Sequence, residues 1–374
     1  MRTCKTCGVS EKDAKFPKRA LNCSKCNNTK KLSEFTMITV KNDIVEEVKN
    51  AVGLIKEAKK AGVGVETIKH AWLKNQKDSS LFVINPLFKD NNKQTEFYHK
   101  LVNDLKEFSP KFPKIKRQNL QDGHLLIVDP ADVHIGKLAS SFETNDEYNN
   151  NIAVKRVLDG VQGILNKSAG FNIEKILFIG GNDILHVDTP KRTTTSGTPQ
   201  DTDGMWYDNF LIAKQLYIDV LTTLLSVSDV HFVFNPSNHD YTNGFFLADV
   251  IQTYFRNCKN ITFECNIAHR KYFRYYDNLI GTTHGDGAKQ TDLPLLMAHE
   301  SKEWSECKHR YIYTHHVHHK TAKDFIGVTI ESLRSPSGSD SWHHRNGYTG
   351  ATKAIEGFIH HRNFGQIARL SHIF

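Results

Sequence analysis

Five apolar runs in the rear two thirds of the chain each stop at a short segment rich in Asp, Asn and His, and this repeated pattern restricts the fold most. The run Ile176–Ile179 stops at Gly180 and Gly181 and is followed by Asp183 and His186. A buried strand that ends in this way delivers its carboxylate to the carboxyl edge of a sheet, where open α/β folds bind their ligands. We therefore expect Asp183 to lie in a binding site.

The other four runs end in comparable segments. They are Asp132-x-His134-x-Gly136 after His124–Val128, Ser237-Asn238-His239-Asp240 after Val230–Phe234, His284-Gly285-Asp286 after Leu279–Thr283, and His315-His316-Val317-His318-His319 after Tyr311–Thr314. Asp and His are ligands suited to Mn²⁺, Fe²⁺ or Zn²⁺, and Asn adds a neutral carbonyl oxygen. A single segment of this kind is common by chance. Five in this order, each after an apolar run, predict a shared metal site with Asp183 bridging two ions.

Helical stretches alternate with these strands, which is typical of a layered α/β domain. The spacing of apolar residues predicts helices over Tyr148–Asn166 and Asn209–Leu225, and Thr189–Gly204 reads as a long polar loop beside the site.

Charge divides the chain unevenly. At 374 residues it has room for a core domain of about 250 residues and a smaller appendage. Residues 1–118 carry 25 Lys and Arg against 13 Asp and Glu, a balance of +12, whereas residues 119–374 carry 24 against 28, a balance of −4. A basic N-terminal part joined to an acidic domain suggests an arm that binds nucleic acid. The alternative is a solvated lysine-rich surface. We expect domains at 1–36, 37–118 and 119–374.

Four of the seven cysteines form a tight pattern, Cys4-x-x-Cys7 and Cys23-x-x-Cys26. Four thiolates at this spacing can surround one structural Zn²⁺, so residues 1–36 are expected to form a zinc ribbon. The other three cysteines are scattered, which favours a reducing, cytoplasmic compartment over a disulfide framework. No apolar run reaches about 18 residues and the first residues lack an apolar signal region, so we expect neither a membrane span nor a secretory signal.

The basic arm between the ribbon and the body is expected to be helical. Asn42–Lys60 has one apolar face and ends before Gly62, and Glu66–Lys74 reads as a second, basic helix. This arrangement suggests a helix-turn-helix that binds DNA, although an ordinary helical hairpin fits nearly as well. Residues 79–118 read as a linker with one helix, Thr95–Phe108, and end in a Pro-broken basic run at 111–117.

Residues 124–320 resemble the calcineurin-like metallophosphoesterases, nearest the SbcD-like exonuclease branch of DNA repair and its phage or prophage members. The motifs that carry the resemblance are Asp132-x-His134-x-Gly136 and Asp183-Ile184-Leu185-His186, because many phosphatases of this superfamily have Asp at the position of His186. The resemblance implies a four-layer α/β/β/α sandwich. It assigns Asp132, His134, Asp183 and His318 to the first metal and Asp183, Asn238, His284 and His316 to the second. His239 would protonate the leaving oxygen, with His186 orienting or assisting it.

Two of the polar segments depart from the usual pattern of this family, and a segment near the C-terminus is also expected to belong to the site. The family usually has Gly where Ser237 and His315 stand, which alters the backbone freedom of those loops. The segment Ser335–His344 is expected to line the site, with Trp342 either stacking on a base or covering a sheet edge.

The function that we expect is a two-metal phosphodiesterase, exo- or endonucleolytic, that hydrolyses DNA in a bacterial host cell, with Mn²⁺ favoured and Fe²⁺, Zn²⁺ or Mg²⁺ as alternatives. The resemblance also implies a homodimer and a coiled-coil ATPase partner. One alternative is a phosphatase or small-molecule phosphodiesterase with the same metals. Another is a DNA-binding or virion-associated protein whose metal site is vestigial.

Overall fold

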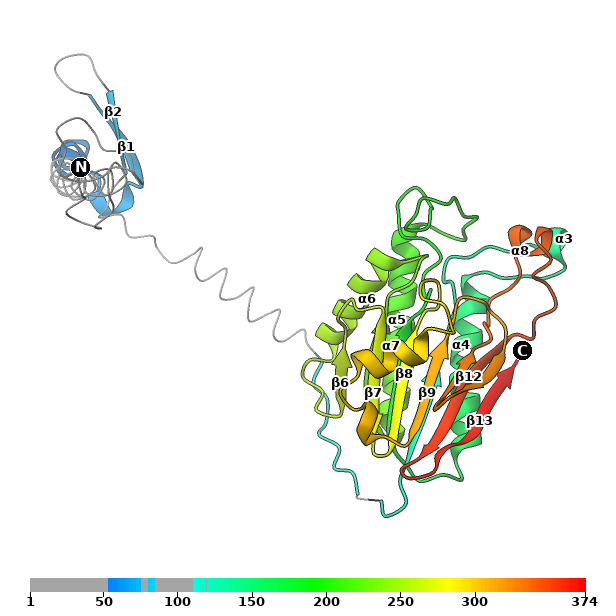
Figure 1. Cartoon of the computed structure of the whole chain (residues 1–374). Coiled ribbons are helices and arrows are strands. Elements are labelled where there is room, and N and C mark those ends of the chain that lie inside the picture. The colour runs from blue at the N-terminus through cyan, green and yellow to red at the C-terminus, as the bar shows by residue number, and fades with distance from the viewer. Residues whose placement is uncertain (1–52, 75–79, 85–109, 119) are drawn as a thin grey trace, which may run out of the picture. The chain divides into compact units, whose positions relative to one another are not determined.

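The computed structural model describes residues 53–74, 80–84, 110–118 and 120–374 (Figure 1). The chain forms two compact units, Met1–Glu107 and Phe108–Phe374. All five strand ends of the sequence pattern fall in the larger unit.

The elements of the larger unit include every strand and helix predicted from residue 124 onward, each within three residues of its predicted ends. In chain order they are β3 (His124–Asp129), α3 (Ser141–Thr144), α4 (Asn150–Ser168), β4 (Ile173–Gly181), α5 (Trp206–Val227), β5 (Asp229–Asn235), α6 (Tyr241–Tyr254), β6 (Ile261–Glu264), β7 (Arg270–Tyr275), β8 (Asn278–Thr283), α7 (Leu293–Glu300), the 3₁₀ turn η2 (Trp304–Glu306), β9 (His309–Thr314), β10 (Thr321–Phe325), β11 (Val328–Ser332), α8 (Ser341–Arg345), β12 (Ala354–His361) and β13 (Gly365–Ile373).

These strands form two mixed sheets. The six-stranded sheet has the order β13-β12-β3-β4-β5-β6, in which β3 to β6 run parallel and β12 is antiparallel to β3. The five-stranded sheet has the order β10-β11-β9-β8-β7, in which β8, β9 and β11 run parallel. The parallel strands that carry the polar segments are therefore neighbours: β3, β4 and β5 in one sheet, and β8 and β9 in the other.

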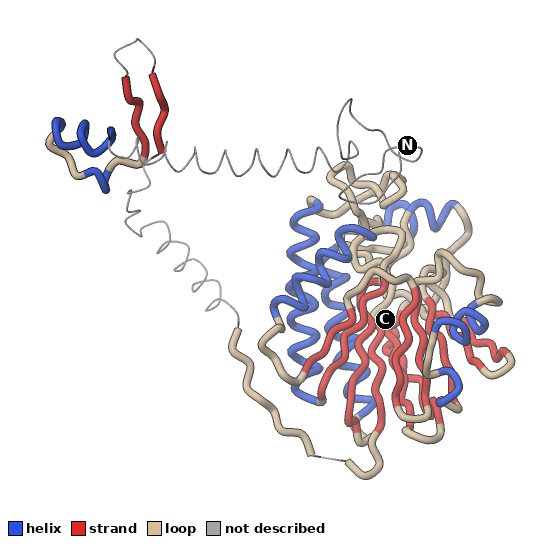
Figure 2. Tube along the Cα trace, turned by 60° about the vertical axis from the view of Figure 1, so that its left-hand side comes forward, coloured by secondary structure: helices blue, strands red, loops and turns tan. Residues whose placement is uncertain are grey.

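The layers follow from side-chain alternation along the buried strands. On β3, Leu126 and Val128 pack under α4, α5 and α6, whereas Leu125 and Ile127 face the five-stranded sheet. On the other side, Leu279 of β8 packs with residues of α7. Because successive strand residues point to opposite faces, strands that are apolar on both faces sit in the interior. The result is an α/β/β/α sandwich, with the helical layer along one side of the strands in Figure 2.

Helix α5 is the one helix in the described ranges that is long and apolar enough to cross a membrane. Core helices of soluble proteins can have the same length and apolar composition, so one such helix does not by itself indicate a membrane span. Residues Ala213, Leu216 and Leu221 of α5 are buried in the core shared with the six-stranded sheet. We therefore interpret α5 as a core helix.

The basic run at 111–117 lies along the larger unit. The ring of Phe112 stacks on Phe255 with 5.1 Å between centroids. The amide N–H of Ile115 donates to Asn260 Oδ1 at 3.1 Å, and Arg117 Nη1 donates to the carbonyl of Val227 at 3.2 Å. These contacts fasten the run to the ends of α5 and α6, so it belongs to this unit.

In the smaller unit, residues 53–61 are helical and the helix ends at Gly62, as predicted. Gly62 has a φ of 68°, a left-handed value that glycine adopts easily, and Val63 N–H donates to the carbonyl of Ala58 at 3.1 Å. The rest of this helix, the helix Thr95–Phe108 and the cysteines Cys4, Cys7, Cys23 and Cys26 lie outside the described residues.

The second helix predicted over Glu66–Lys74 is wrong, and with it the helix-turn-helix-like arm. This segment forms the short 3₁₀ turn η1 (Val65–Thr67) and then β1 (His70–Lys74), which pairs antiparallel with β2 (Ser80–Ile84). The segment was too short for its apolar spacing to separate a helix from a strand. The sequence Leu-Phe-Val-Ile in β2 favours a strand, because aromatic and β-branched residues fit a pleated sheet.

Buried His360 between the two sheets is expected to make the fold sensitive to acid. Its Nε2 lies 2.8 Å from Tyr313 Oη, and burial lowers its pKa to about 3. The unfolded chain takes up a proton near pH 6.5 and the folded one does not, so stability is lost as pH falls below 6.5, by about 2–3 kcal/mol at pH 4.5. Denaturant unfolding at pH 7 and pH 4.5 should show that His360→Gln removes this loss, whereas His319→Gln, at an exposed histidine, retains it. An equal loss of stability between pH 7 and pH 4.5 in all three proteins would show that His360 is not a source of the acid sensitivity.

Candidate metal centre

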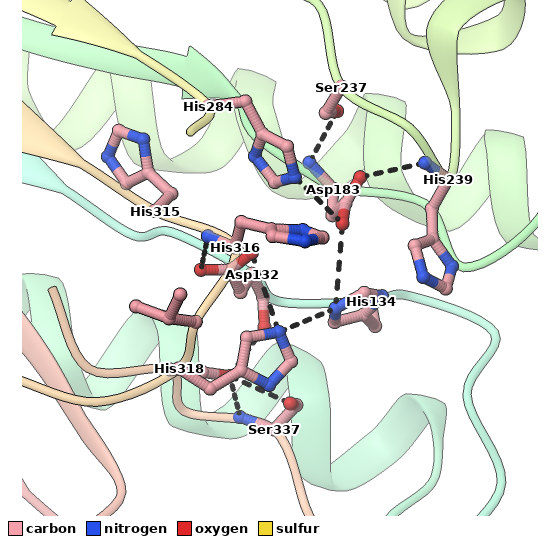
Figure 3. A network of polar contacts seen from close by, with 12 residues as sticks. Asp132, His134, Asp183, Ser237, His239, His284, His315, His316, His318 and Ser337 are labelled. Atoms are coloured by element: carbon pink, nitrogen blue, oxygen red, sulfur yellow. Dashed lines mark hydrogen bonds and ion pairs between the residues drawn. The ribbon is translucent and has the colours of Figure 1, made fainter. Parts of the chain in front are cut away.

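The polar segments after β3, β4, β5, β8 and β9 meet at one edge of the sandwich (Figure 3). Each follows the carboxyl end of a parallel strand, and the two sheets pack face to face, so five loops converge. The structure brings together all seven residues predicted as active-site metal ligands, namely Asp132, His134, Asp183, Asn238, His284, His316 and His318. Their role as ligands stays a prediction.

Asp132, His134 and His318 form the first of the two clusters that consist of predicted metal ligands alone, with one potential ligand atom from each within 4.8 Å of the others. The Nε2 atoms of His134 and His318 are 3.3 Å apart, and His318 Nε2 lies 3.5 Å from Asp132 Oδ1. Asp132 and His134 are buried, whereas the His318 side chain is 16% exposed. The cluster is therefore closed by protein on one side and open toward solvent at His318.

Asp183, His284 and His316 form the second cluster, again within 4.8 Å of one another. His284 Nε2 lies 3.2 Å from Asp183 Oδ2 and 3.0 Å from Asn238 Oδ1. His316 is exposed, and its backbone N–H donates to both carboxylate oxygens of Asp132, at 3.2 and 3.1 Å. This backbone contact ties the two clusters together.

Asp183 lies at the junction of the clusters. Its Oδ2 is 3.2 Å from His284 Nε2 and 3.9 Å from His134 Nε2. Its Oδ1 accepts the backbone N–H of His239 at 3.0 Å. One oxygen of the carboxylate therefore faces both clusters, and the other fixes the orientation of the carboxylate.

The electrostatics of this group fit divalent cations. Burial alone would raise the pKa of Asp183, but the imidazoles of His284 and His239 lower it well below its ordinary value, so the carboxylate stays ionised. Burial lowers the pKa of His134 well below 6.5 and keeps that ring neutral. Against the effect of burial, Asp183 and Asp132 raise the pKa of His284 to about 9, so the site favours positive charge at this position. A divalent cation would supply this charge in place of the proton on His284, and carboxylates with imidazoles are a donor set for Mn²⁺, Fe²⁺ or Zn²⁺, compatible with a binuclear site.

The backbone of these loops is strained. Six of the nine non-glycine residues with left-handed φ in the described ranges belong to the site, namely Asp132, His134, Asn182, Asp183, His316 and His318. Each such conformation costs about 1–3 kcal/mol and persists only where surrounding contacts hold it. Asp132 N–H donates to the carbonyl of Asn182, and His134 N–H to that of Asp183, both at 2.9 Å. Strain concentrated in this way indicates a functional site.

Ser237, where the resembled family has glycine, supports the second loop. Its hydroxyl accepts the N–H of Asp183 at 2.7 Å and donates to Asp240 Oδ1 at 2.6 Å. Asp240 is buried, and its Oδ2 accepts the N–H of Leu185 at 2.8 Å. Ser237 therefore adds hydrogen bonds that hold Asp183 in place, and Asp240 orients the loop that carries Asp183.

His315, the other residue at a glycine position, is buried beside the clusters. One ring nitrogen lies 2.9 Å from Asp129 Oδ2 and the other donates to the carbonyl of Thr283 at 3.0 Å. Both ring nitrogens of His315 therefore have partners, and the residue joins the two sheets. His319 and Asp286 are exposed.

His186 and His239, predicted as catalytic residues, stack on each other with 5.2 Å between ring centroids. His239 is half-buried, and its Nδ1 donates to the carbonyl of His186 at 2.9 Å. His186 is buried, with its Nδ1 3.2 Å from His134 Nδ1, and burial lowers its pKa well below 6.5. His239 therefore has a free Nε2, whereas His186 faces a predicted ligand.

The C-terminal segment lines the site, as expected, through contacts with the first loop. Ser335 Oγ donates to the carbonyl of Asp132 at 2.7 Å. Sequence reasoning missed Lys137 and the contact through which it anchors this segment. Lys137 is buried, and its Nζ lies 3.0 Å from Asp340 Oδ2, while Asp340 Oδ1 lies 2.7 Å from His343 Nδ1. In the sequence, the one indication that Lys137 belongs to the site was its position directly after Asp132-x-His134-x-Gly136.

Comparisons with known proteins give a weak fold likeness. No family model and no curated protein matches this sequence. Among solved structures, the chain is similar to a single mutant of Vps29 from Entamoeba histolytica (12% identity, 67% of this chain, 99% of that chain, TM-score 0.30) and to Vps29 from Chaetomium thermophilum (11%, 67%, 98%, 0.31). A conserved uncharacterized protein of Streptococcus pneumoniae, described as a predicted phosphoesterase, is similar at 12% identity over 67% of this chain and 97% of that one, with a TM-score of 0.27. At these values the likeness carries no conclusion about activity, so function has to be argued from the side chains of this chain.

Proposed function

We propose that this protein is a calcineurin-like metallophosphoesterase that hydrolyses phosphodiester bonds in DNA with two divalent ions. The observation that carries the proposal is the convergence of seven donor side chains from five strand ends into two clusters that meet at Asp183.

In this proposal, the first ion is held by Asp132, His134, Asp183 and His318, and the second by Asp183, Asn238, His284 and His316, with Mn²⁺ favoured. Two such ions supply an acidified water and neutralise charge on a phosphate. The protein contributes fixed positions, because the donors come from loops held by backbone hydrogen bonds rather than from mobile surface chains.

His239 supplies the proton to the leaving oxygen. Its Nδ1 donates to the carbonyl of His186, which leaves Nε2 free to carry the transferable proton. Its backbone N–H holds Asp183 Oδ1, so the acid and the shared carboxylate are fixed by the same residue. Imidazole is the side chain that most often donates or accepts a proton in catalysis near neutral pH.

His186 positions the first cluster. If His134 offers the lone pair of Nε2 to an ion, its Nδ1 must carry a proton and needs an acceptor. His186 Nδ1, 3.2 Å away on a neutral buried ring, is that acceptor. A partner of this kind fixes the tautomer and orientation of a ligand histidine.

Two features favour DNA over a phosphomonoester. His186 stands where many phosphatases of the resembled superfamily have Asp. The front part of the chain carries a balance of +12, suited to a polyanion. We also assign one structural Zn²⁺ to Cys4, Cys7, Cys23 and Cys26, on their spacing, and a cytoplasmic location, on the scattered remaining cysteines.

A substrate panel tests the proposal. Full-length protein with Mn²⁺ should degrade labelled single- or double-stranded DNA and bis(p-nitrophenyl) phosphate but leave a phosphoserine peptide intact. EDTA should abolish the activity and added Mn²⁺ restore it, because the donors cannot position a phosphate without ions. Turnover of the phosphopeptide but not of DNA would favour the phosphatase alternative. No turnover and no bound Mn²⁺ would favour the vestigial one.

A further inference from the structure

A row of aromatic rings leads from the first cluster out to solvent. The ring of His343 stacks on the ring of His318, with centroids 5.4 Å apart and an interplanar angle of 20°. Trp342 packs edge-on against His343 at 5.2 Å, and Tyr348 lies against Trp342 at 5.6 Å and 30°. The row begins at a residue assigned to the metal centre and ends on the surface.

Buried contacts hold this row in place. Asp340 accepts the backbone N–H of His343 at 2.9 Å and lies 2.7 Å from its Nδ1, while Lys137, from the first metal loop, lies 3.0 Å from the same carboxylate. Tyr348 N–H donates to the carbonyl of His343 at 2.9 Å. The short helix α8 and the turn after it are therefore fastened to the loop that carries Asp132 and His134.

The outer end of the row is open and basic. Trp342 is 61% exposed and Tyr348 is 63% exposed. Arg345 lies exposed in the last turn of α8. Large exposed aromatic rings are costly in water unless something covers them, and a neighbouring positive charge favours an anionic chain.

We infer that Trp342 and Tyr348 form a stacking platform for an unpaired nucleobase of a single-stranded nucleic acid whose phosphate lies at the metal centre. This inference rests on the proposed function and extends it to the form of the substrate. A flat base presents a π-face that stacks on an indole whatever its sequence, and an adjacent Arg can contact the backbone. Bases inside a duplex have both faces covered by their neighbours, so the platform favours single strands and frayed ends.

The test compares two oligonucleotides that differ only in their bases. Full-length protein in EDTA is titrated against fluorescein-labelled oligothymidylate of twelve residues and against an abasic chain of the same length and charge. The wild type should bind the thymidine chain about tenfold more tightly, since stacking is lost without bases. In Trp342→Ala the ratio of the two dissociation constants should fall to near one, and Trp342→Phe should retain most of it.

Phe364→Ala is the matched control. Phe364 is 72% exposed and stacks on His361 in the turn between β12 and β13, at the end of the sandwich where β3 begins. This variant should keep the wild-type ratio. The inference is overturned if the wild type shows no preference for bases, or if Trp342→Ala keeps that preference. If base-dependent binding is found but no oligonucleotide is cleaved with Mn²⁺, the proposed function fails while the platform stands.

Discussion

Asp183→Asn is expected to lower the turnover of DNA and of bis(p-nitrophenyl) phosphate by at least about a thousandfold, an effect of about 4 kcal/mol on the barrier. The carboxylate presents one oxygen to both clusters, so a neutral amide at this position weakens both at once. Steady-state kinetics in saturating Mn²⁺ measure the effect.

Asp286→Asn serves as the control for this variant. It removes the same charge from the neighbouring loop after β8, but its side chain is exposed. Its turnover should stay within about threefold of the wild type, in the range of surface substitutions. A folded Asp183→Asn protein that retains a tenth or more of wild-type activity would contradict the role given to this residue.

His239→Asn is expected to show a defect that depends on the leaving group. With DNA, whose leaving alkoxide needs a proton, kcat should fall by about 10²–10⁴-fold, the usual contribution of general acid catalysis. With bis(p-nitrophenyl) phosphate, whose nitrophenolate leaves without a proton, the loss should be much smaller. The comparison separates proton donation from positioning, because a residue that merely holds Asp183 in place would affect both substrates equally.

His319→Asn is the matched control for this prediction. His319 is exposed, and its Nδ1 contacts the carbonyl of Val317, away from the free Nε2 of His239. It should change neither rate appreciably. If His239→Asn lowers the turnover of both substrates equally, His239 is not the general acid and acts only as a positioning residue.

The sequence predicted the part of the fold that buries apolar strands. β3, β4 and β5 are apolar on both faces because one face meets the helices and the other meets the second sheet, and such runs stand out in a sequence. The polar residues that follow these strands were recognisable as site candidates because of their position in the sequence. A carboxylate or imidazole directly after a buried strand has few places to lie other than the carboxyl edge of the sheet.

Elements with weaker patterns were missed or misread. β10 is largely exposed and β13 is partly so, and neither shows a long apolar run. In the smaller unit, β1 was predicted as a helix because its five residues are too few to show a helical or a strand period, and pairing with β2 makes the segment a strand.

The geometry within the site could not be predicted from the sequence either. Asp132, Asp183 and His316 have left-handed φ values. Asp and His adopt such values more often than most non-glycine residues, but still in so few cases that the residue type alone does not predict them. The pair of Lys137 and Asp340 joins residues 203 positions apart, and only the folded chain brings them together. The same holds for His186, whose partner His134 follows a different strand.

Anomalous diffraction from crystals of the full-length protein soaked in Mn²⁺ tests the two-metal centre most directly. Two manganese peaks are expected on either side of Asp183 Oδ2, one among Asp132, His134 and His318 and the other among Asn238, His284 and His316. Both peaks should weaken together in crystals of Asp183→Asn. A single peak, or two peaks that persist at full height in the variant, would contradict the claim that one carboxylate unites the two clusters.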